Sequence, residues 1–189
     1  SGQHLRAPGT RALIAVALLA ACGALGSEAL AQAKSPTDQA RKLGQEAWQA
    51  LDANNYKEAL DKANEAEALY HAPTHLLMIG HAQVGLGRLA EALATYERLA
   101  AEPLPDSGPP AFKEAQEKGR KRMKELLARV PSLLVAVEGA DGAAPVVTVD
   151  AKVVDFASGV AVRLDPGEHA ITVTTPGFEM VKRTVTLPE

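Results

Sequence analysis

Residues 55–60 read Asn-Tyr-Lys-Glu-Ala-Leu, and residues 88–93 read Arg-Leu-Ala-Glu-Ala-Leu. The two stretches align, with Ala59 and Ala92 separated by 33 residues. Self-similarity at a fixed period is typical of repeat architectures, in which each copy buries its hydrophobic face against the next copy. The alignment therefore predicts two copies of a helical unit between residues 38 and 102.

Each copy carries small residues where two helices pack closely, and a turn residue between its helices. The packing positions are Ala47, Tyr56, Ala59 and Ala66 in the first copy and Gly80, Leu89, Ala92, Tyr96 and Leu99 in the second. Asn54 and Gly87 suit the left-handed conformation that ends a helix before a tight reversal. Pro73 separates the copies, at a place where a helix start tolerates its missing N–H.

This arrangement resembles the tetratricopeptide repeat, whose unit is about 34 residues long. The resemblance covers roughly a third of the chain and implies an inner face formed by the first helix of each copy. It assigns to that face Arg41, Gly44, Trp48, Leu51 and Asp52 from the first copy and Thr74, Leu77, His81 and Val84 from the second. Some family members hold a terminal carboxylate with a lysine and an asparagine. Gly44 and Trp48 occupy those two positions here, so that mode of binding is not expected.

A proline- and glycine-rich break from Pro103 to Pro110 precedes a further predicted helix, from Ala111 to Arg129. One apolar stripe at helical spacing indicates a cap over the second copy: Phe112, Ala115, Gly119, Met123, Leu126, Leu127 and Val130. The same helix is rich in Lys and Arg, including Lys113, Arg120 and Lys124. These charges have two open interpretations: a solvated face, or a basic wall of the groove that attracts an acidic protein or peptide.

After Pro131 the pattern changes to short, alternating apolar runs. We expect residues 132–189 to form an antiparallel meander of five strands, from the runs Leu133–Val137, Val146–Val149, Val160–Leu164, the stretch around Ile171 and Val173, and Phe178–Leu187. Because the period changes at Pro131, we expect residues 32–130 to fold independently of these strands.

The turns of this segment resemble those of the PEGA domain of bacterial envelope proteins. Asp165-Pro166-Gly167-Glu168-His169 is followed by an alternating strand, then by Pro176-Gly177-Phe178 and a final strand. The resemblance implies a small β-sandwich-like module. The fold class is thus α+β with several domains: a helical solenoid of two repeats and a capping helix, then this module.

The first 31 residues have the features of an export signal. Arg6 and Arg11 precede ten apolar residues, 12–21, which match a signal-peptide core. Ala29-Leu30-Ala31 has the form of a signal-peptidase site, whereas Leu19-Ala20-Ala21-Cys22 resembles a bacterial lipobox, whose cysteine becomes lipidated. Both interpretations stay open, and both place the protein in the periplasm or cell envelope. The sequence lacks an initial Met and stops just after a strand-like run, so a fragment of a longer chain stays an open alternative, with a further C-terminal segment that could include a membrane helix.

Composition and motifs indicate no catalytic or cofactor site. A net charge of −3 provides no cationic field for nucleic acid, and the single cysteine excludes an internal disulfide. His71, His75 and His81 are interpreted as helix-surface residues rather than metal ligands, because Pro73 interrupts the helix between the first two. No serine lies in a nucleophile-elbow frame.

These features predict a non-catalytic scaffold that binds another protein or peptide. The candidate groove residues are Arg41, Trp48, Asp52, Leu77, His81, Val84, Lys113, Arg120 and Lys124. One alternative is a peptidoglycan- or carbohydrate-binding module, for which the C-terminal segment offers only Phe156 and Phe178 as rings. Another is an accessory of a hydrolase whose catalytic residues lie in a C-terminal part outside this sequence.

Overall fold

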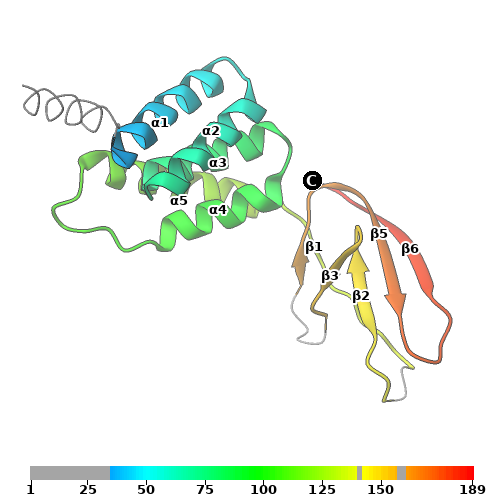
Figure 1. Ribbon diagram of the computed structural model, residues 1–189. Helices are drawn as coiled ribbons and strands as arrows, with labels where there is room; N and C mark the ends of the chain where they lie inside the picture. The colour runs from blue at the N-terminus through cyan, green and yellow to red at the C-terminus, as the bar shows by residue number, and fades with distance from the viewer. Residues whose placement is uncertain (1–34, 140–141, 157–160) are drawn as a thin grey trace, which may run out of the picture. The chain divides into compact units, whose positions relative to one another are not determined.

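The computed structural model describes residues 35–139, 142–156 and 161–189 (Figure 1). The proposed export signal, Cys22 and the predicted strand residue Val160 lie outside these ranges. The described residues form five helices followed by antiparallel strands in two sheets, so the fold is of the α+β class.

The helices are α1 (Pro36–Asp52), α2 (Tyr56–Leu69), α3 (Pro73–Gly85), α4 (Leu89–Ala101) and α5 (Pro110–Leu127). Each helix packs against the next one along the chain, and α3 also contacts α1 and α5. The first helix of each pair therefore lies beside the first helix of the next pair. In this arrangement α1, α3 and α5 share one side of the helical part, whereas α2 and α4 separate them along the chain.

The predicted breaks between the helices are confirmed. Asn54 and Gly87 have φ angles of 57° and 76°, in the left-handed region, and each lies in the turn between two paired helices. Pro73 is the first residue of α3, and residues 102–109 are not helical. These boundaries follow from local backbone preferences, since Gly and Asn tolerate a positive φ and Pro cannot continue a helix.

The predicted small positions are buried at the centre of the helical part. Ala47, Ala59, Ala66 and Ala92 are 0–1% exposed, and Tyr96 and Leu99 are fully buried. The capping helix begins one residue earlier than predicted and ends at Leu127 rather than Arg129. Ala115, Leu126 and Val130 join this core as expected, but Leu127 is 46% exposed. Leu127 directly follows the buried Leu126, so the helical rotation of 100° per residue turns it away from the core.

The C-terminal strands are β1 (Ser132–Leu133), β2 (Val146–Val149), β3 (Lys152–Val154), β4 (Val162–Arg163), β5 (Gly167–Thr174) and β6 (Val181–Leu187). The order is β3-β2-β5-β6 in one sheet, and β1 pairs with β4 in the other. The prediction of a five-strand meander is therefore wrong for the described residues. β2 pairs with β5 across the intervening chain, and the hairpin partner β3 was not predicted.

The β2–β3 hairpin turns at Asp150 and Ala151, whose φ angles are 47° and 64°. Such a turn is usually marked by Asn-Gly or Asp-Gly, so the sequence carried no signal for it. Contacts from β5 stabilise it: the Ala170 amide donates to Asp150 Oδ1 at 3.0 Å, and His169 Nδ1 lies 2.6 Å from Asp150 Oδ2. Tertiary contacts thus replace the missing glycine.

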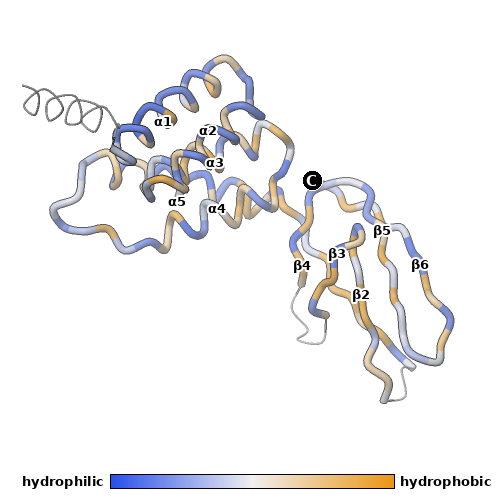
Figure 2. The backbone as a smooth tube through the Cα atoms, in the orientation of Figure 1, coloured by the Kyte–Doolittle hydropathy of each residue, from blue (hydrophilic) through white to orange (hydrophobic). Residues whose placement is uncertain are grey.

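The strands enclose a small hydrophobic core of their own. Val147, Val149 and Ile171 are at most 9% exposed, and Phe156 packs against them. In Figure 2, β2 is largely hydrophobic, whereas α1 is mainly hydrophilic. None of the helices in the described ranges is both long and apolar enough to cross a bilayer.

Candidate functional site

A cavity of about 330 Å³ opens on the helical part beside α1, α3 and α5, and it is called the groove below. Its lining residues are Trp48, Leu51, Asp52, Tyr56, His81, Val84, Gly85, Tyr96, Arg122, Glu125, Leu126 and Arg129. They come from five helices and the turn after α5. The groove therefore depends on α3, which packs against both α1 and α5.

Three aromatic rings form a row from the surface to the bottom of the groove. The ring centroids of Trp48 and His81 are 6.0 Å apart at an interplanar angle of 67°, and those of His81 and Tyr96 are 6.1 Å apart at 68°. Trp48 is 38% exposed and Tyr96 is fully buried. Edge-to-face contacts of this kind hold rings in a defined orientation, so His81 is fixed between an exposed ring and a buried one.

Tyr96 reaches its position because Gly80 carries no side chain. A Cβ atom on Gly80 would lie 2.4 Å from the Tyr96 ring, which is closer than real contacts allow. The Tyr96 hydroxyl is buried and has no hydrogen-bond partner among the described residues. Burial raises the pKa of this hydroxyl well above its ordinary value, so it is protonated and able to donate.

Charged groups of α5 form one wall of the groove. Arg122 Nη1 lies 2.8 Å from Glu125 Oε2, and both side chains are about half exposed. Arg129 pairs with Glu189, near the end of the chain. Burial, together with the charges of Arg122 and Lys118, lowers the pKa of His81, so the ring is neutral near pH 7.

The groove brings together four of the predicted site residues: Trp48, Asp52, His81 and Val84. Leu77 does not belong to it, because its side chain is 3% exposed and lies in the core of the helical part. Arg41 lines a second cavity, with Tyr70, His75 and Phe112. Its Nη1 atom lies 3.0 Å from Asp38 Oδ1.

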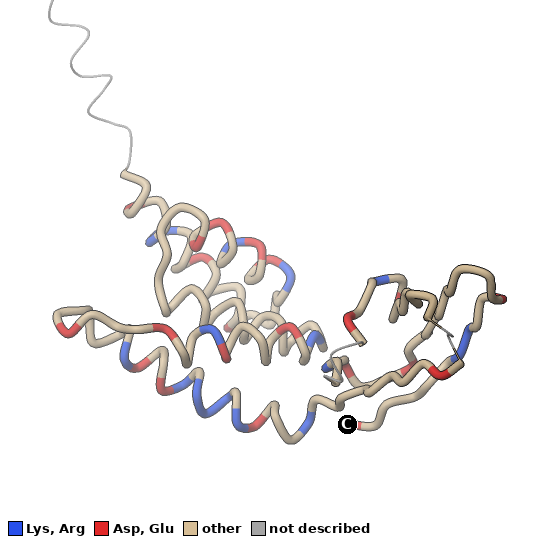
Figure 3. Tube along the Cα trace, turned by 90° about the horizontal axis from the view of Figure 1, so that it is seen from below, with Lys and Arg blue, Asp and Glu red and all other residues tan. Residues whose placement is uncertain are grey.

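The three predicted residues of α5 are exposed but do not line the groove. Arg120 instead donates to the Ala100 carbonyl at 3.3 Å and to Gln116 Oε1 at 2.9 Å, which places it on the side that faces α4. Lys113 and Lys124 likewise lie outside the lining set. Figure 3 shows closely spaced Lys and Arg residues along α5. The composition of α5 could not show which of these Lys and Arg residues face the groove.

Sequence analysis missed Tyr56, Tyr96, Arg122, Glu125, Leu126 and Arg129 as groove residues. A usable signal existed for α5, because Arg122, Leu126 and Arg129 follow the i, i+4, i+7 spacing of one helix face. That face could have been selected through Leu126, which was already predicted to be buried. For Tyr96 the sequence indicated a packing position, and it gave no sign that the hydroxyl would lack a partner.

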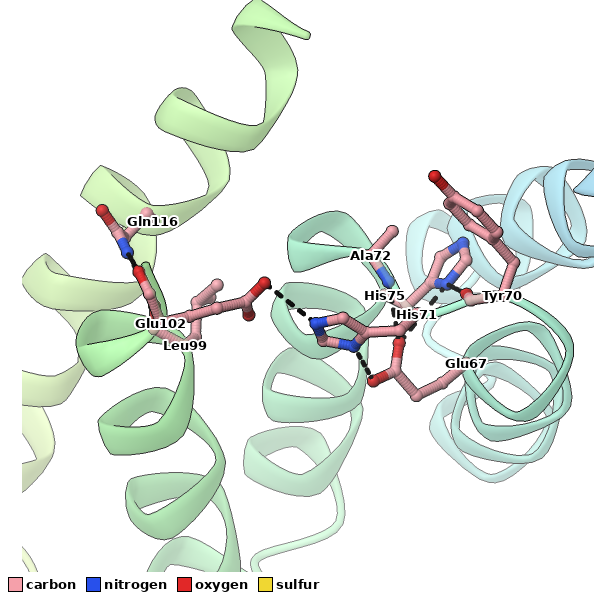
Figure 4. Close-up of polar contacts among 8 residues, drawn as sticks. All are labelled: Glu67, Tyr70, His71, Ala72, His75, Leu99, Glu102 and Gln116. Atoms are coloured by element: carbon pink, nitrogen blue, oxygen red, sulfur yellow. Dashed lines mark hydrogen bonds and ion pairs between the residues drawn. The ribbon is translucent and has the colours of Figure 1, made fainter. Parts of the chain in front are cut away.

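A second polar cluster joins the two helix pairs (Figure 4). It lies after the C-terminal ends of α2 and α4, whereas the turns at Asn54 and Gly87 precede the N-terminal ends of these helices. His71 Nδ1 lies 2.5 Å from Glu67 Oε1, and its Nε2 lies 2.9 Å from Glu102 Oε1. Gln116 donates to the Glu102 carbonyl at 2.7 Å. His75 is 6% exposed and donates from Nδ1 to the Tyr70 carbonyl at 3.0 Å, so the expectation of a surface histidine is wrong for His75.

Other candidate features have structural roles. Both ring nitrogens of His169 are used, by Asp150 and by the Asp165 carbonyl at 2.7 Å. Phe156 packs against the strand core, and Phe178 is 51% exposed. Within the described ranges, no three His, Cys, Asp or Glu side chains are placed to hold a metal ion. Comparisons with protein families, with curated proteins and with solved structures gave no match.

Proposed function

We propose that this protein is a non-catalytic adaptor of the bacterial cell envelope, which binds a segment of another protein in the groove. The helical part would be a two-repeat tetratricopeptide-type solenoid, and the strands a β-sandwich-like module related to PEGA domains. The paired helices, the alanine contacts between them and the left-handed turns at Asn54 and Gly87 support the first assignment. The export features of residues 1–31 support the location.

The observation that carries the binding function is the position of Trp48. This residue is the single tryptophan of the chain, it is 38% exposed, and its ring lies at the opening of the groove against His81. A large ring that stays partly exposed has apolar area left to bury, and tryptophan is among the residues most enriched at interaction hot spots. We infer that a partner completes its burial.

The test uses partners recovered on the immobilised chain from an envelope extract of its native host, each then purified and titrated. Trp48→Ala should weaken binding of a genuine groove partner by about 2 kcal/mol or more, mainly through a faster off-rate. Leu69→Ala is the matched control, because Leu69 is 41% exposed and lines neither cavity. Equal losses for both variants, or none for Trp48→Ala, would contradict the proposal.

The same variants distinguish a binding residue from a core residue. Trp48 does not belong to the buried core cluster, so Trp48→Ala should lower the free energy of unfolding by less than about 1 kcal/mol. A loss of several kcal/mol in urea unfolding would instead assign Trp48 to the core.

A further inference from the structure

The groove opens at the carboxyl-terminal ends of α1, α3 and α5. Each of these helices contributes two residues of its last turn to the lining: Leu51, Asp52, Val84, Gly85, Glu125 and Leu126. Aligned peptide dipoles give the carboxyl end of a helix a partial negative charge, which favours a cation nearby. Neither α1 nor α3 carries a basic residue in its last turn. These two helix ends therefore favour a positively charged occupant.

Asp52 is the lining residue whose charge is not yet paired. The other charged groups of the groove are engaged, since Arg122 lies 2.8 Å from Glu125 and Arg129 pairs with Glu189. Asp52 is exposed, and in the part of the chain that the structure describes its carboxylate has no ion pair or hydrogen bond. The helix dipole repels a negative charge at this end of α1, so the carboxylate does not stabilise its own helix. Its charge is available to a ligand.

Two aromatic rings line the groove together with Asp52. Trp48 lies four positions before it, on the same face of α1, and is 38% exposed. The ring of Tyr56 lies against α3, where a Cβ atom on Gly85 would overlap it, and its hydroxyl donates to Asn54 Oδ1 at 2.6 Å. The face of an aromatic ring attracts cations, and most often the guanidinium of arginine. A free carboxylate beside held rings thus matches a planar cation.

We propose that the groove binds an arginine side chain of the partner segment, whose guanidinium pairs with the Asp52 carboxylate and stacks on Trp48. This inference rests on the proposed function and specifies its ligand. A guanidinium can donate two hydrogen bonds to a carboxylate and lie on a ring, whereas a lysine ammonium is a strongly hydrated point charge. An acidic partner would need Lys113, Arg120 and Lys124, which do not line the groove.

The experiment titrates the full chain with the peptide Ac-Ala-Leu-Arg-Leu-Ala-NH2 and with counterparts that carry citrulline, Lys or Glu at the central position. Citrulline is neutral and has nearly the same shape as arginine. Trp48 is the single tryptophan, so its fluorescence reports occupancy of the groove. At about 50 mM salt the Arg peptide should bind at least about fivefold more tightly than the citrulline peptide. The preference should shrink at about 500 mM salt, because salt screens an exposed ion pair.

Two variants assign the preference to its residues. Asp52→Asn should reduce the Arg/citrulline preference to about twofold or less, whereas the matched control Asp61→Asn should keep it, because Asp61 is an exposed helical aspartate that lines neither cavity. Trp48→Leu, followed by calorimetry, should weaken binding of the Arg peptide by about threefold or more. Asp52→Asn should leave the melting temperature unchanged or higher, since it removes a charge that the helix dipole repels.

The outcomes separate this inference from the proposed function. Equal binding of the Arg and citrulline peptides, or a preference that survives Asp52→Asn, overturns the inference but leaves a peptide-binding groove in place. A Lys peptide that binds as tightly as the Arg peptide overturns the assignment to arginine, and a Glu peptide that binds best overturns it in favour of an acidic partner. No saturable response of Trp48 to any peptide also overturns the inference. The proposed function then fails only if authentic partners bind Trp48→Ala as tightly as the unmodified chain.

Discussion

His71 Nε2 lies 2.9 Å from Glu102 Oε1, a contact that spans 31 residues of sequence and joins the linker after α2 to the end of α4. The other ring nitrogen of His71 faces Glu67 at 2.5 Å. A ring that donates to a carboxylate from both nitrogens must carry both protons. The contact between the two helix pairs is thus made by an imidazolium, which makes it sensitive to pH.

The stability of the helical part should therefore fall as the pH rises above neutrality. Hydrogen bonds to Glu67 and then to Glu102 raise the pKa of His71 above 6.5. The stabilisation from this raised pKa is complete below about pH 6.5 and is lost as the pH rises through the folded-state value. Because the ring is about half exposed, we expect less than about 1 kcal/mol.

At acidic pH the same cluster loses stabilisation as the pH falls, through Glu67. Burial alone would raise the pKa of Glu67, but hydrogen bonds from His75, His71 and the Ala72 amide outweigh it, and the pKa lies below 4.5. Its stabilisation is present above about pH 4.5 and is lost as the pH falls through the lowered folded-state pKa. The cluster is thus most stabilising between the ordinary carboxylate pKa and the raised pKa of His71.

Urea unfolding of the unmodified chain and of His71→Ala at about pH 6 and about pH 9 checks this prediction. The difference in unfolding free energy between the two proteins should be larger at the lower pH. His169→Gln is a second test in the strands, where Asp150 first and then the Asp165 carbonyl raise the pKa of His169, so its difference should also be larger at the lower pH. A constant difference for His71→Ala would show that the ring is not charged in the folded state.

Two helical glycines should respond in opposite ways to alanine. Gly80→Ala places a methyl group 2.4 Å from the ring of the fully buried Tyr96, and it should lower the free energy of unfolding by about 1–3 kcal/mol. Gly44→Ala meets its nearest atom, His75 Nε2, at 3.4 Å, and it should be neutral or gain up to about 1 kcal/mol from helix propensity. Thermal unfolding compares them, and equal effects would refute the close approach at Gly80.

Gly87 tests backbone strain without any packing effect. Its φ is 76°, and no atom lies within 4 Å of a Cβ added there. Gly87→Ala should cost about 1 kcal/mol because an alanine disfavours the left-handed region, and Gly87→Asn should recover part of that loss. Asn54 already holds the equivalent turn at a φ of 57°. Equal stability of the Ala variant and the unmodified chain would mean that the turn adopts another conformation.

The proposed export predicts a processed N-terminus in the native host. Mass spectrometry of the mature protein should find a start at Gln32, or at a lipidated Cys22. Replacing Cys22 with Ser should abolish membrane fractionation only in the lipoprotein case. An intact Ser1 terminus in the cytosolic fraction would contradict both forms of the proposal.

Sequence alone determined where the chain breaks between the helices, although it misplaced both ends of α5. Asn54, Pro73 and Gly87 act through their own backbone preferences, which do not depend on distant residues. The change of hydrophobic period at Pro131 likewise predicted strands. The regular alanine spacing identified the buried positions of α1, α2 and α4. All of these signals are local, so they can be recognised before any tertiary contact is known.

Only the tertiary structure decided which side chains meet. On α5 neighbouring cations differ by 100° of rotation, so packing against α3 and α4 selects Arg122 for the groove and turns Arg120 toward Gln116. The turn at Asp150 depends on β5, because the Ala170 amide of that strand donates to Asp150 Oδ1. The buried position of the Tyr96 ring depends on Gly80, 16 positions earlier, because a side chain on Gly80 would overlap that ring.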